Sequence, residues 1–369
     1  MNGQWAAEYQ GSNTGLVVVD IDLVNDHYEG TACAWDSNPQ LASSFVRFRT
    51  NDLKPDQNLT VPVFPIDNDG NFMSPTDLAT KFPNGVMPTS VNIELKLKNN
   101  KLSATWKTDI STWGAVTADL PKTRAGNESD LKSLNIKSWD QFKKFVKALE
   151  SGRYVFRGQE NKKWRLRTSY HRRGRANLER FLGQDVTALA KSLSAMTKHV
   201  FDLSNPLQHG AFVSLAQHHG YPTPLLDWSH SPYVSAFFAF RSAPKDIARR
   251  SQKRVRIFVF DLRKWNELKQ YPKLAQTRPH FSVLDALAIE NQRMIPQQAI
   301  STMTNVDDIE TYIQSVEKLT KVEYLQVIDL PVGQRAEVMR ELRQMGITAA
   351  SMFPGLDGAC EELRERMFP

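Results

Sequence analysis

The tripeptide Phe156-Arg157-Gly158 closes a short apolar run that starts at Tyr154. An arginine at a strand end presents a planar fork of N–H donors, which suits the paired oxygens of a phosphate or carboxylate. A glycine beside it lets a ligand approach the backbone, and Gln159 adds a further hydrogen-bonding group. Arg157, Gly158 and Gln159 are therefore candidate binding residues. The alternative is that Arg157 belongs to a structural ion pair.

A second polar group is Asp227-Trp228-Ser229, which follows a stretch stiffened by two prolines. In an extended chain Asp227 and Ser229 point one way and Trp228 the other. The two polar side chains are then placed to face a ligand, and we take all three residues as candidates. The alternative is that Asp227 or Ser229 caps the helix predicted from Ser231 and that Trp228 lies in the core.

Two further pairs complete the candidate set. His218 and His219 lie at the predicted end of a helix, and imidazole changes its charge near neutral pH. Gln297 and Gln298 follow a proline and offer neutral groups that orient a ribose or an amide. A lone Gln-Gln pair is equally typical of an ordinary polar surface.

The elements that position these residues fall into two regions. Residues 1–120 have β character, with apolar and acidic residues alternating from Val19 on in the run 15–24 and a hairpin around Asn99-Asn100. We expect an antiparallel β sandwich or small barrel there, serving as a recognition or regulatory domain that binds a protein trigger or target. Residues 121–137 are polar and predict a linker, and 138–369 predict a mixed α+β domain.

Within the second region, Ser138 and Gln141 form a capping-box pattern that starts a helix over 139–150. A strand is predicted from Arg153 to Arg157. Helices are predicted at 176–182, 186–201, 212–218, 231–242 and 332–345, a strand at 256–261, and runs that fit strand or helix at 283–288 and 322–328.

Several function classes are excluded by what the sequence lacks. It has no phosphate-binding P-loop, no dinucleotide-binding glycine pattern, no nucleophile-elbow motif and no zinc-protease motif. The eight histidines form no metal-ligand spacing and the two cysteines, Cys33 and Cys360, are far apart, so we expect neither a metal nor a disulfide framework. No long apolar run predicts a membrane span, the first residues do not resemble a signal peptide, and a cytoplasmic location is expected.

The charge distribution leaves an alternative open. The net charge is +7, and basic residues gather in 162–175 and 249–256 with Trp164 and Tyr170 interleaved. Aromatic rings between cations are typical of nucleic-acid binding, because bases stack on the rings while phosphates pair with the cations. The same clusters are also typical of solvated surfaces. A nucleic-acid-binding or nucleolytic protein is therefore one hypothesis.

The motifs taken together resemble the FRG-domain family, named for its F-R-G motif. The resemblance is carried by Phe156-Arg157-Gly158, by Ala216-Gln217-His218-His219-Gly220, by Leu225-Leu226-Asp227-Trp228-Ser229 and by Asn291-x-Arg293 with Gln297-Gln298. It covers roughly Ser138 to Leu363 and leaves out the β-rich region.

The order of these motifs is also similar to the layout of ADP-ribosyltransferases, which carry one functional group on each of three core strands. That similarity implies that Arg157 grips the pyrophosphate of NAD as a substrate, that Ser229 and Trp228 seat the nicotinamide ribose, and that Gln298 takes the third-strand position. The implied acceptor is a protein or a nucleic acid, and the implied role is a toxin-like effector in bacterial defence against phage.

One departure bears on this implied activity. The third-strand residue of such enzymes is normally a glutamate, whose charge stabilises an oxocarbenium-like transition state, and glutamine supplies no charge. Glu290 or Asp227 would have to supply it. Pro224 also stands where the family commonly has arginine. A non-catalytic module that senses a nucleotide is therefore a third hypothesis.

Overall fold

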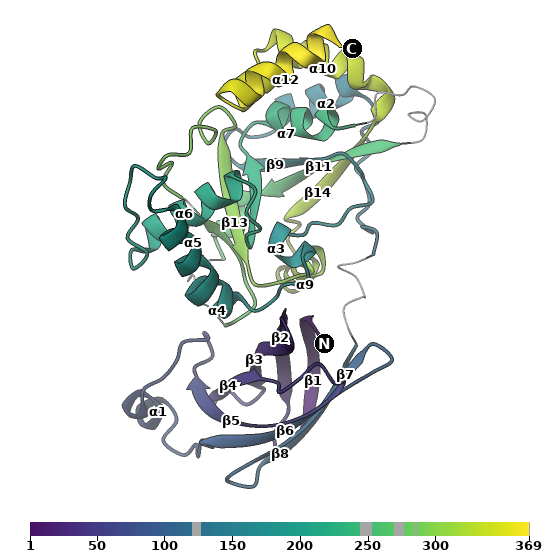
Figure 1. Ribbon diagram of the computed structural model, residues 1–369. Coiled ribbons are helices and arrows are strands. Elements are labelled where there is room, and N and C mark those ends of the chain that lie inside the picture. The colour runs from purple at the N-terminus through teal and green to yellow at the C-terminus, as the bar shows by residue number, and fades with distance from the viewer. Residues whose placement is uncertain (120–126, 244–252, 269–276, 285, 369) are drawn as a thin grey trace.

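The computed structural model describes residues 1–119, 127–243, 253–268, 277–284 and 286–368. Its N-terminal part is a closed antiparallel barrel whose eight strands follow chain order (Figure 1). The barrel closes where Gln10 and Gly11 of the first strand pair with Ala115 and Gly114 of the last. Closure removes the free edges that an open sheet would expose. Of the two predicted all-β forms, the small barrel is the one observed.

The barrel strands and their intervening helix have the following bounds: β1 (Gly3–Gly11), β2 (Gly15–Val24), β3 (His27–Asp36), β4 (Ser43–Arg49), β5 (Asp56–Ile66), α1 (Pro75–Lys81), β6 (Ser90–Lys98), β7 (Lys101–Thr108) and β8 (Trp113–Asp119). Alternate residues point inward. On β2, Val17, Val19 and Ile21 join the interior cluster while Asp20 and Asp22 lie on the outer face, as the alternation predicts. The hairpin at Asn99-Asn100 is also confirmed, and both asparagines have a positive φ.

The second part is built on a six-stranded sheet of order β12-β13-β10-β9-β11-β14, in which all neighbours are antiparallel. Its strands are β9 (Tyr154–Gln159), β10 (Leu225–Ser229), β11 (Arg254–Asp261), β12 (Phe281–Leu284), β13 (Ala299–Thr304) and β14 (Leu325–Pro331). The fold class is therefore α+β, with a β barrel followed by a domain of an antiparallel sheet and helices, as predicted.

The helices that cover this sheet have these bounds: α2 (Trp139–Ala148), α3 (Ser169–Arg172), α4 (Leu178–Arg180), a π-helical turn (Phe181–Asp185), α5 (Val186–Leu193), α6 (Pro206–His218), α7 (Pro232–Arg241), α8 (Leu262–Asn266), α9 (Ile309–Thr320), a 3₁₀ turn (Val332–Gln334), α10 (Arg335–Gln344), α11 (Ala349–Met352) and α12 (Leu356–Met367). One face of the sheet packs with α2, α7, α10 and α11, and the other with α8 and α9. Among the described residues no helix is long and apolar enough to span a membrane.

Some predicted elements differ from the observed ones. The helix predicted over 186–201 ends at Leu193, because Met196 and Val200 beyond it are largely exposed and have no core to pack against. The helix predicted from residue 212 begins earlier, at Pro206, since Asn205 caps it by accepting two backbone N–H groups. The ambiguous runs overlap the strands β12 and β14 at residues 283–284 and 325–328. The strand β13 was not among the predicted elements, although the similarity to ADP-ribosyltransferases implied a strand at Gln298, one residue before it.

Part of the predicted linker lies on the sheet. Its first residues, through 126, lie outside the described residues. From there on, the Ser129 hydroxyl donates to Glu310 at 2.8 Å and the Leu134 amide donates to the Val327 carbonyl of β14 at 2.9 Å. Residues 127–137 are therefore held by the second part of the molecule.

The barrel docks through a buried carboxylate on its outer face. Asp22 accepts hydrogen bonds from the backbone N–H groups of Ala176 at 2.7 Å and Asn177 at 3.1 Å, and from Arg175 Nε at 2.5 Å. The side chain of Asp22 is fully buried. A buried carboxylate is tolerable only when it is paired and hydrogen-bonded, so removing these partners would leave a costly uncompensated charge.

Asp20, two residues away, makes this interface sensitive to pH. Burial, with the neighbouring carboxylates of Asp22 and Asp307 adding to it, raises the pKa of Asp20 to about 7, against the hydrogen bond from Gln4 that lowers it. The unfolded chain loses this proton near pH 4. Between about pH 4 and 7 the folded protein therefore holds a proton that the unfolded chain has lost, and stability falls as the pH rises through that range.

We predict that Asp20→Asn removes this dependence, because asparagine stays neutral and still accepts from Gln4. At pH 8 the midpoint of thermal unfolding should rise by about 2–4 °C, which corresponds to ~1 kcal/mol, while at pH 4 it should match the parent. Scanning calorimetry at both pH values measures this. Asp56→Asn, on an exposed barrel residue, is the matched control. Parallel pH profiles for parent and Asp20→Asn would contradict the prediction.

Candidate functional site

Arg157 lies where two neighbouring strands separate. β9 pairs with β11 along its whole length, from Tyr154 to Gln159, but with β10 at one residue pair, Phe156 with Ser229. Beyond that pair the ladder between β9 and β10 stops. The Nη1 atom of Arg157 spans the gap and donates to the backbone carbonyl of Asp227 at 2.6 Å. The arginine thus takes the place of a ladder hydrogen bond.

The guanidinium of Arg157 has donors to spare. Its Nε is buried without a hydrogen-bond partner, and so is the Oε1 of Gln159, two residues further along β9. Because residues two apart on a strand share a face, both groups open to the same side of the sheet. Each unsatisfied buried polar group costs about 1–3 kcal/mol. A ligand with phosphate oxygens and a hydroxyl group would satisfy both.

The charge around Arg157 is positive. Burial lowers the pKa of Arg157 to about 10, with the carboxylate of Asp227 opposing and Arg172 reinforcing this shift. The group stays protonated at neutral pH. Arg172, at the end of α3, donates from Nη1 to the Arg167 carbonyl at 2.6 Å. The charges of one carboxylate and one further guanidinium therefore both act on Arg157.

Asp227 is the carboxylate of this group. Its side chain is exposed, and its Oδ1 accepts from the Ser301 hydroxyl of β13 at 3.1 Å. Asp227 and Ser301 are directly paired in the sheet. Sequence reasoning missed Ser301 because it did not predict β13.

Trp228 and Ser229 are occupied by protein contacts. The Trp228 indole N–H donates to Thr302 at 3.0 Å and the ring stacks on Phe260, on the face opposite Asp227. The Ser229 hydroxyl donates to the Gln297 carbonyl at 2.7 Å and accepts from the Ser231 amide at 3.0 Å. Trp228 therefore lies in the core, as the alternative predicted, but the cap of α7 is Ser231 rather than Asp227 or Ser229.

Gly158 serves the packing of a helix. A Cβ atom at this position would lie 1.9 Å from the Ser235 carbonyl oxygen and 2.7 Å from the Ala239 amide, both in α7. The missing side chain therefore lets α7 lie directly on β9. The sequence suggested that this glycine lets a ligand approach the backbone, whereas the structure shows that it lets a helix approach the strand.

The remaining candidates lie outside the Arg157 group. Gln297 Nε2 donates to the Met352 carbonyl at 2.8 Å, and Gln298 is exposed with a left-handed φ of 47°. Burial, with Arg293 and His219 adding to it, lowers the pKa of His218 to about 4, so this imidazole is neutral. His219 caps the end of α6.

Glu290, the other carboxylate considered from the sequence, is not directed toward Arg157. The Glu290 carboxylate accepts from the His199 amide at 2.5 Å, so this contact directs it elsewhere. Asp227 is therefore the nearer of the two carboxylates considered from the sequence. No group of three metal-ligating side chains occurs within the described parts of the chain.

Five of the ten lysines and arginines in the described parts of the basic clusters form ion pairs within the protein. Arg165 pairs with Asp308 at 2.9 Å and Arg256 pairs with Asp329 at 2.7 Å, and both arginines are buried. The other pairs in these clusters are Arg167 with Asp307, Arg175 with Asp22 and Asp185, and Lys163 with Glu128. Residues 249–252 lie outside the described residues. Paired cations are poorly available to phosphates, so this arrangement does not favour nucleic-acid binding.

Comparison with known proteins identifies the domain that holds this site. Residues 152–247 match the family model of the FRG domain. The match includes β9, α3, α6, β10 and α7, and with them Arg157 and Asp227, but not Gln297 and Gln298. No curated protein and no solved structure matches the chain. The chain therefore carries an FRG domain, and the similarity to an ADP-ribosyltransferase layout stays a prediction.

The packing at Gly158 gives a stability prediction. Gly158→Ala should destabilise the protein by about 1–3 kcal/mol, because α7 must move off the sheet. Thermal unfolding followed by circular dichroism measures the loss. Gly183→Ala is the matched control, since a Cβ there meets nothing within 4 Å. Equal midpoints for the two variants would show that α7 does not depend on this glycine.

Proposed function

We propose that the FRG domain binds NAD, or a nucleotide with the same pyrophosphate, at Arg157, and cleaves it to transfer or hydrolyse ADP-ribose. The observation that carries the proposal is the buried, unpartnered Nε atom of the half-buried Arg157, together with the unpartnered Gln159 Oε1 two residues along the same strand. A buried cation with unused donors is a site for an anion.

A pyrophosphate suits this site in shape and charge. Arginine binds two phosphate oxygens at once through parallel N–H donors, which lysine does not do. Arg172 lies near enough to Arg157 to disfavour its charge, and an anionic ligand relieves that repulsion. A ribose hydroxyl donating to Gln159 Oε1 would satisfy the second unpartnered atom.

The proposed reaction breaks the bond between nicotinamide and its ribose. Nicotinamide leaves with the electron pair of that bond, and positive charge develops on the ribose ring. A carboxylate beside the ring stabilises this charge in the transition state. Asp227 is the group we assign to it, because its carboxylate is exposed, acts electrostatically on Arg157 and is oriented by Ser301.

The attacking group then adds to the same ribose carbon and gives up a proton. Water as the attacking group makes the reaction a hydrolysis, and a nucleophile of a protein or nucleic acid makes it a transfer. In this scheme Ser229 and Trp228 act as positioning residues, since their hydrogen bonds hold β10 against the Gln297 loop and β13.

A variant series at Arg157 and Asp227 tests the proposal. Arg157→Ala should weaken NAD binding by at least about tenfold, because the loss of a charge-assisted hydrogen bond is worth roughly 1.5–3 kcal/mol. Asp227→Asn should retain binding but lose turnover, because it keeps the shape and removes the charge. Calorimetry with NAD and chromatographic detection of released nicotinamide measure the two effects.

Arg173→Ala is the matched control, since it removes a nearby exposed charge outside the gap. Binding unaffected by Arg157→Ala would refute the site. Binding of NAD without release of nicotinamide, with water or with added protein and nucleic acid, would favour a nucleotide-sensing module instead.

A toxin-like role in defence against phage follows if the reaction consumes NAD in the cell or modifies an essential target. Expression of the protein in bacteria should then arrest growth, and Asp227→Asn should restore it. Growth curves after induction, with equal protein levels checked by immunoblot, measure this. Arrest that persists in the Asp227→Asn variant would separate toxicity from the proposed chemistry.

A further inference from the structure

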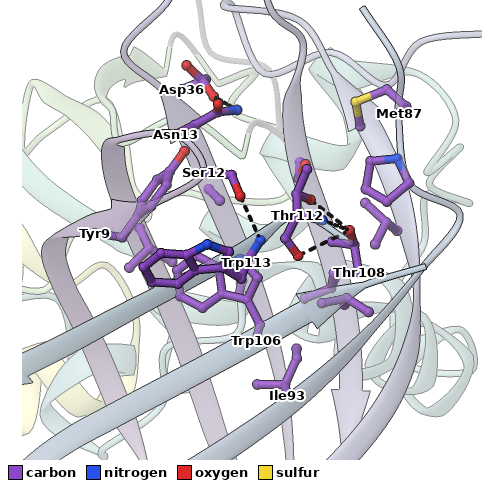
Figure 2. Close-up of a pocket in the computed structure, with 18 of the residues that line it drawn as sticks. Tyr9, Ser12, Asn13, Asp36, Met87, Ile93, Trp106, Thr108, Thr112 and Trp113 are labelled. Atoms are coloured by element: carbon purple, nitrogen blue, oxygen red, sulfur yellow. Dashed lines mark hydrogen bonds between the residues drawn. The ribbon is translucent and has the colours of Figure 1, made fainter. Parts of the chain in front are cut away.

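The barrel holds a cavity that the FRG site does not involve. Its volume is about 180 Å³, and it lies among inward-facing side chains between the strands (Figure 2). One end of the barrel interior is filled by Met1, Trp5 and Ile21, which are all buried. The cavity occupies the remainder and reaches the surface at the opposite end, where the turns around Ser12, Leu41, Met87 and Ile110 line it.

Small side chains create this space. Ala32 and Ala34 of β3 and Ala104 of β7 face inward where larger residues would fill the barrel. Eight-stranded barrels are narrow enough that ordinary side chains fill them, or else they hold one small ligand. A cavity at this position therefore departs from close packing, which costs stability unless something occupies it.

The cavity wall is apolar. It consists mainly of valine, leucine, isoleucine, alanine and aromatic side chains, including Val17, Val46, Ile93 and Trp106. The polar groups near it satisfy one another. Thr108 and Thr112 bond through their hydroxyls at 2.7 Å, and the Trp113 amide donates to the Ser12 hydroxyl at 3.0 Å (Figure 2). Such a wall favours an apolar guest over water, since an apolar cavity of roughly 150 Å³ stays dry and accepts benzene.

The mouth of the cavity carries one acidic group. Asp36 accepts from Asn13 Nδ2 and from the Asn38 amide, each at 2.8 Å. Burial and then Asp36 raise the pKa of Tyr9, so this phenol keeps its proton. The rim also exposes large apolar side chains, with Val86 75% and Trp113 57% exposed. A ligand that enters the cavity would therefore contact an apolar rim and a carboxylate that repels anions.

We propose that the barrel binds a small, mainly apolar molecule whose polar end is a hydrogen-bond donor or a cation, with the apolar body among Ala34, Ala104 and Trp106 and the polar end at Asp36. Fatty acids are disfavoured, because their carboxylate would meet Asp36. This site stands apart from the FRG site and does not depend on the proposed reaction.

Titration of the full-length protein with 1-octanol and with octanoate tests the proposal. These probes have the same chain length and differ at the polar end. Calorimetry, with tryptophan fluorescence as a second signal, should show octanol binding at least about tenfold more tightly than octanoate. Asp36→Asn should bring the two affinities within about threefold of each other.

Substitutions that fill the cavity should weaken the binding of octanol. Ala34→Leu should weaken octanol binding by at least about tenfold, and Ala104→Leu, from the opposite wall, should do the same if the first variant folds poorly. Ala6→Leu is the matched control, because this exposed residue makes the same change on the barrel exterior. Circular dichroism shows which variants fold.

Three results would overturn the proposal. They are absence of octanol binding up to its solubility limit, octanol affinity that both cavity-filling variants leave unchanged, and octanoate binding as tightly as octanol. The second result would indicate adsorption to the exposed rim.

Discussion

The strand β9 contacts three elements, β11, β10 and α7, in three different ways, and these contacts determine where the candidate site of the FRG domain lies. It is laddered to β11 over its whole length, touches β10 at one residue pair, and lies against α7 at a glycine where a side chain would collide. Arg157 stands between the last two of these contacts. Its guanidinium therefore lies where the two strands separate, and it donates to the backbone carbonyl of Asp227. The position of a cation with unused donors is thus a consequence of strand pairing.

The two parts of the molecule are joined by a different kind of interaction. Asp22 of the barrel is buried among N–H groups of the second part, and a buried charge tolerates little displacement before its partners are lost. Asp20 beside it holds its proton to near neutral pH. The docking is therefore specific in geometry and sensitive to pH, which an apolar interface of the same size would not be.

The two candidate ligand sites differ in physical character. At Arg157 the polar groups exceed the partners that the protein supplies, so the expected ligand is charged. At the barrel cavity, polar groups such as Thr108 and Thr112 bond to each other and space is left among apolar side chains, so the expected ligand is apolar. One chain thus combines a proposed anion site on an open sheet with an apolar cavity in a closed one.

The sequence by itself determined the order and type of the main elements and the residues worth considering. Alternation in β2, the asparagine hairpin and the cap at Ser138 are local signals, because they depend on neighbours within a few residues. It also indicated the FRG domain, since that resemblance rests on residue identity. The strand β13 and the barrel closure were missed or left open, because they depend on partners far along the chain, whereas the early start of α6 rests on the local cap at Asn205 and was overlooked.

Tertiary structure alone decided what each candidate side chain does. In the sequence, Gly158 and Trp228 resemble residues that bind a ligand. In the structure, Gly158 lets α7 pack on β9, and Trp228 stacks on Phe260 in the core. Arg157 looks like a residue for an ion pair, but strand divergence leaves its Nε without a partner. The physical reason is that a side chain's role depends on which groups surround it and which hydrogen bonds they leave unmade, and those neighbours come from elements that lie far apart in the sequence.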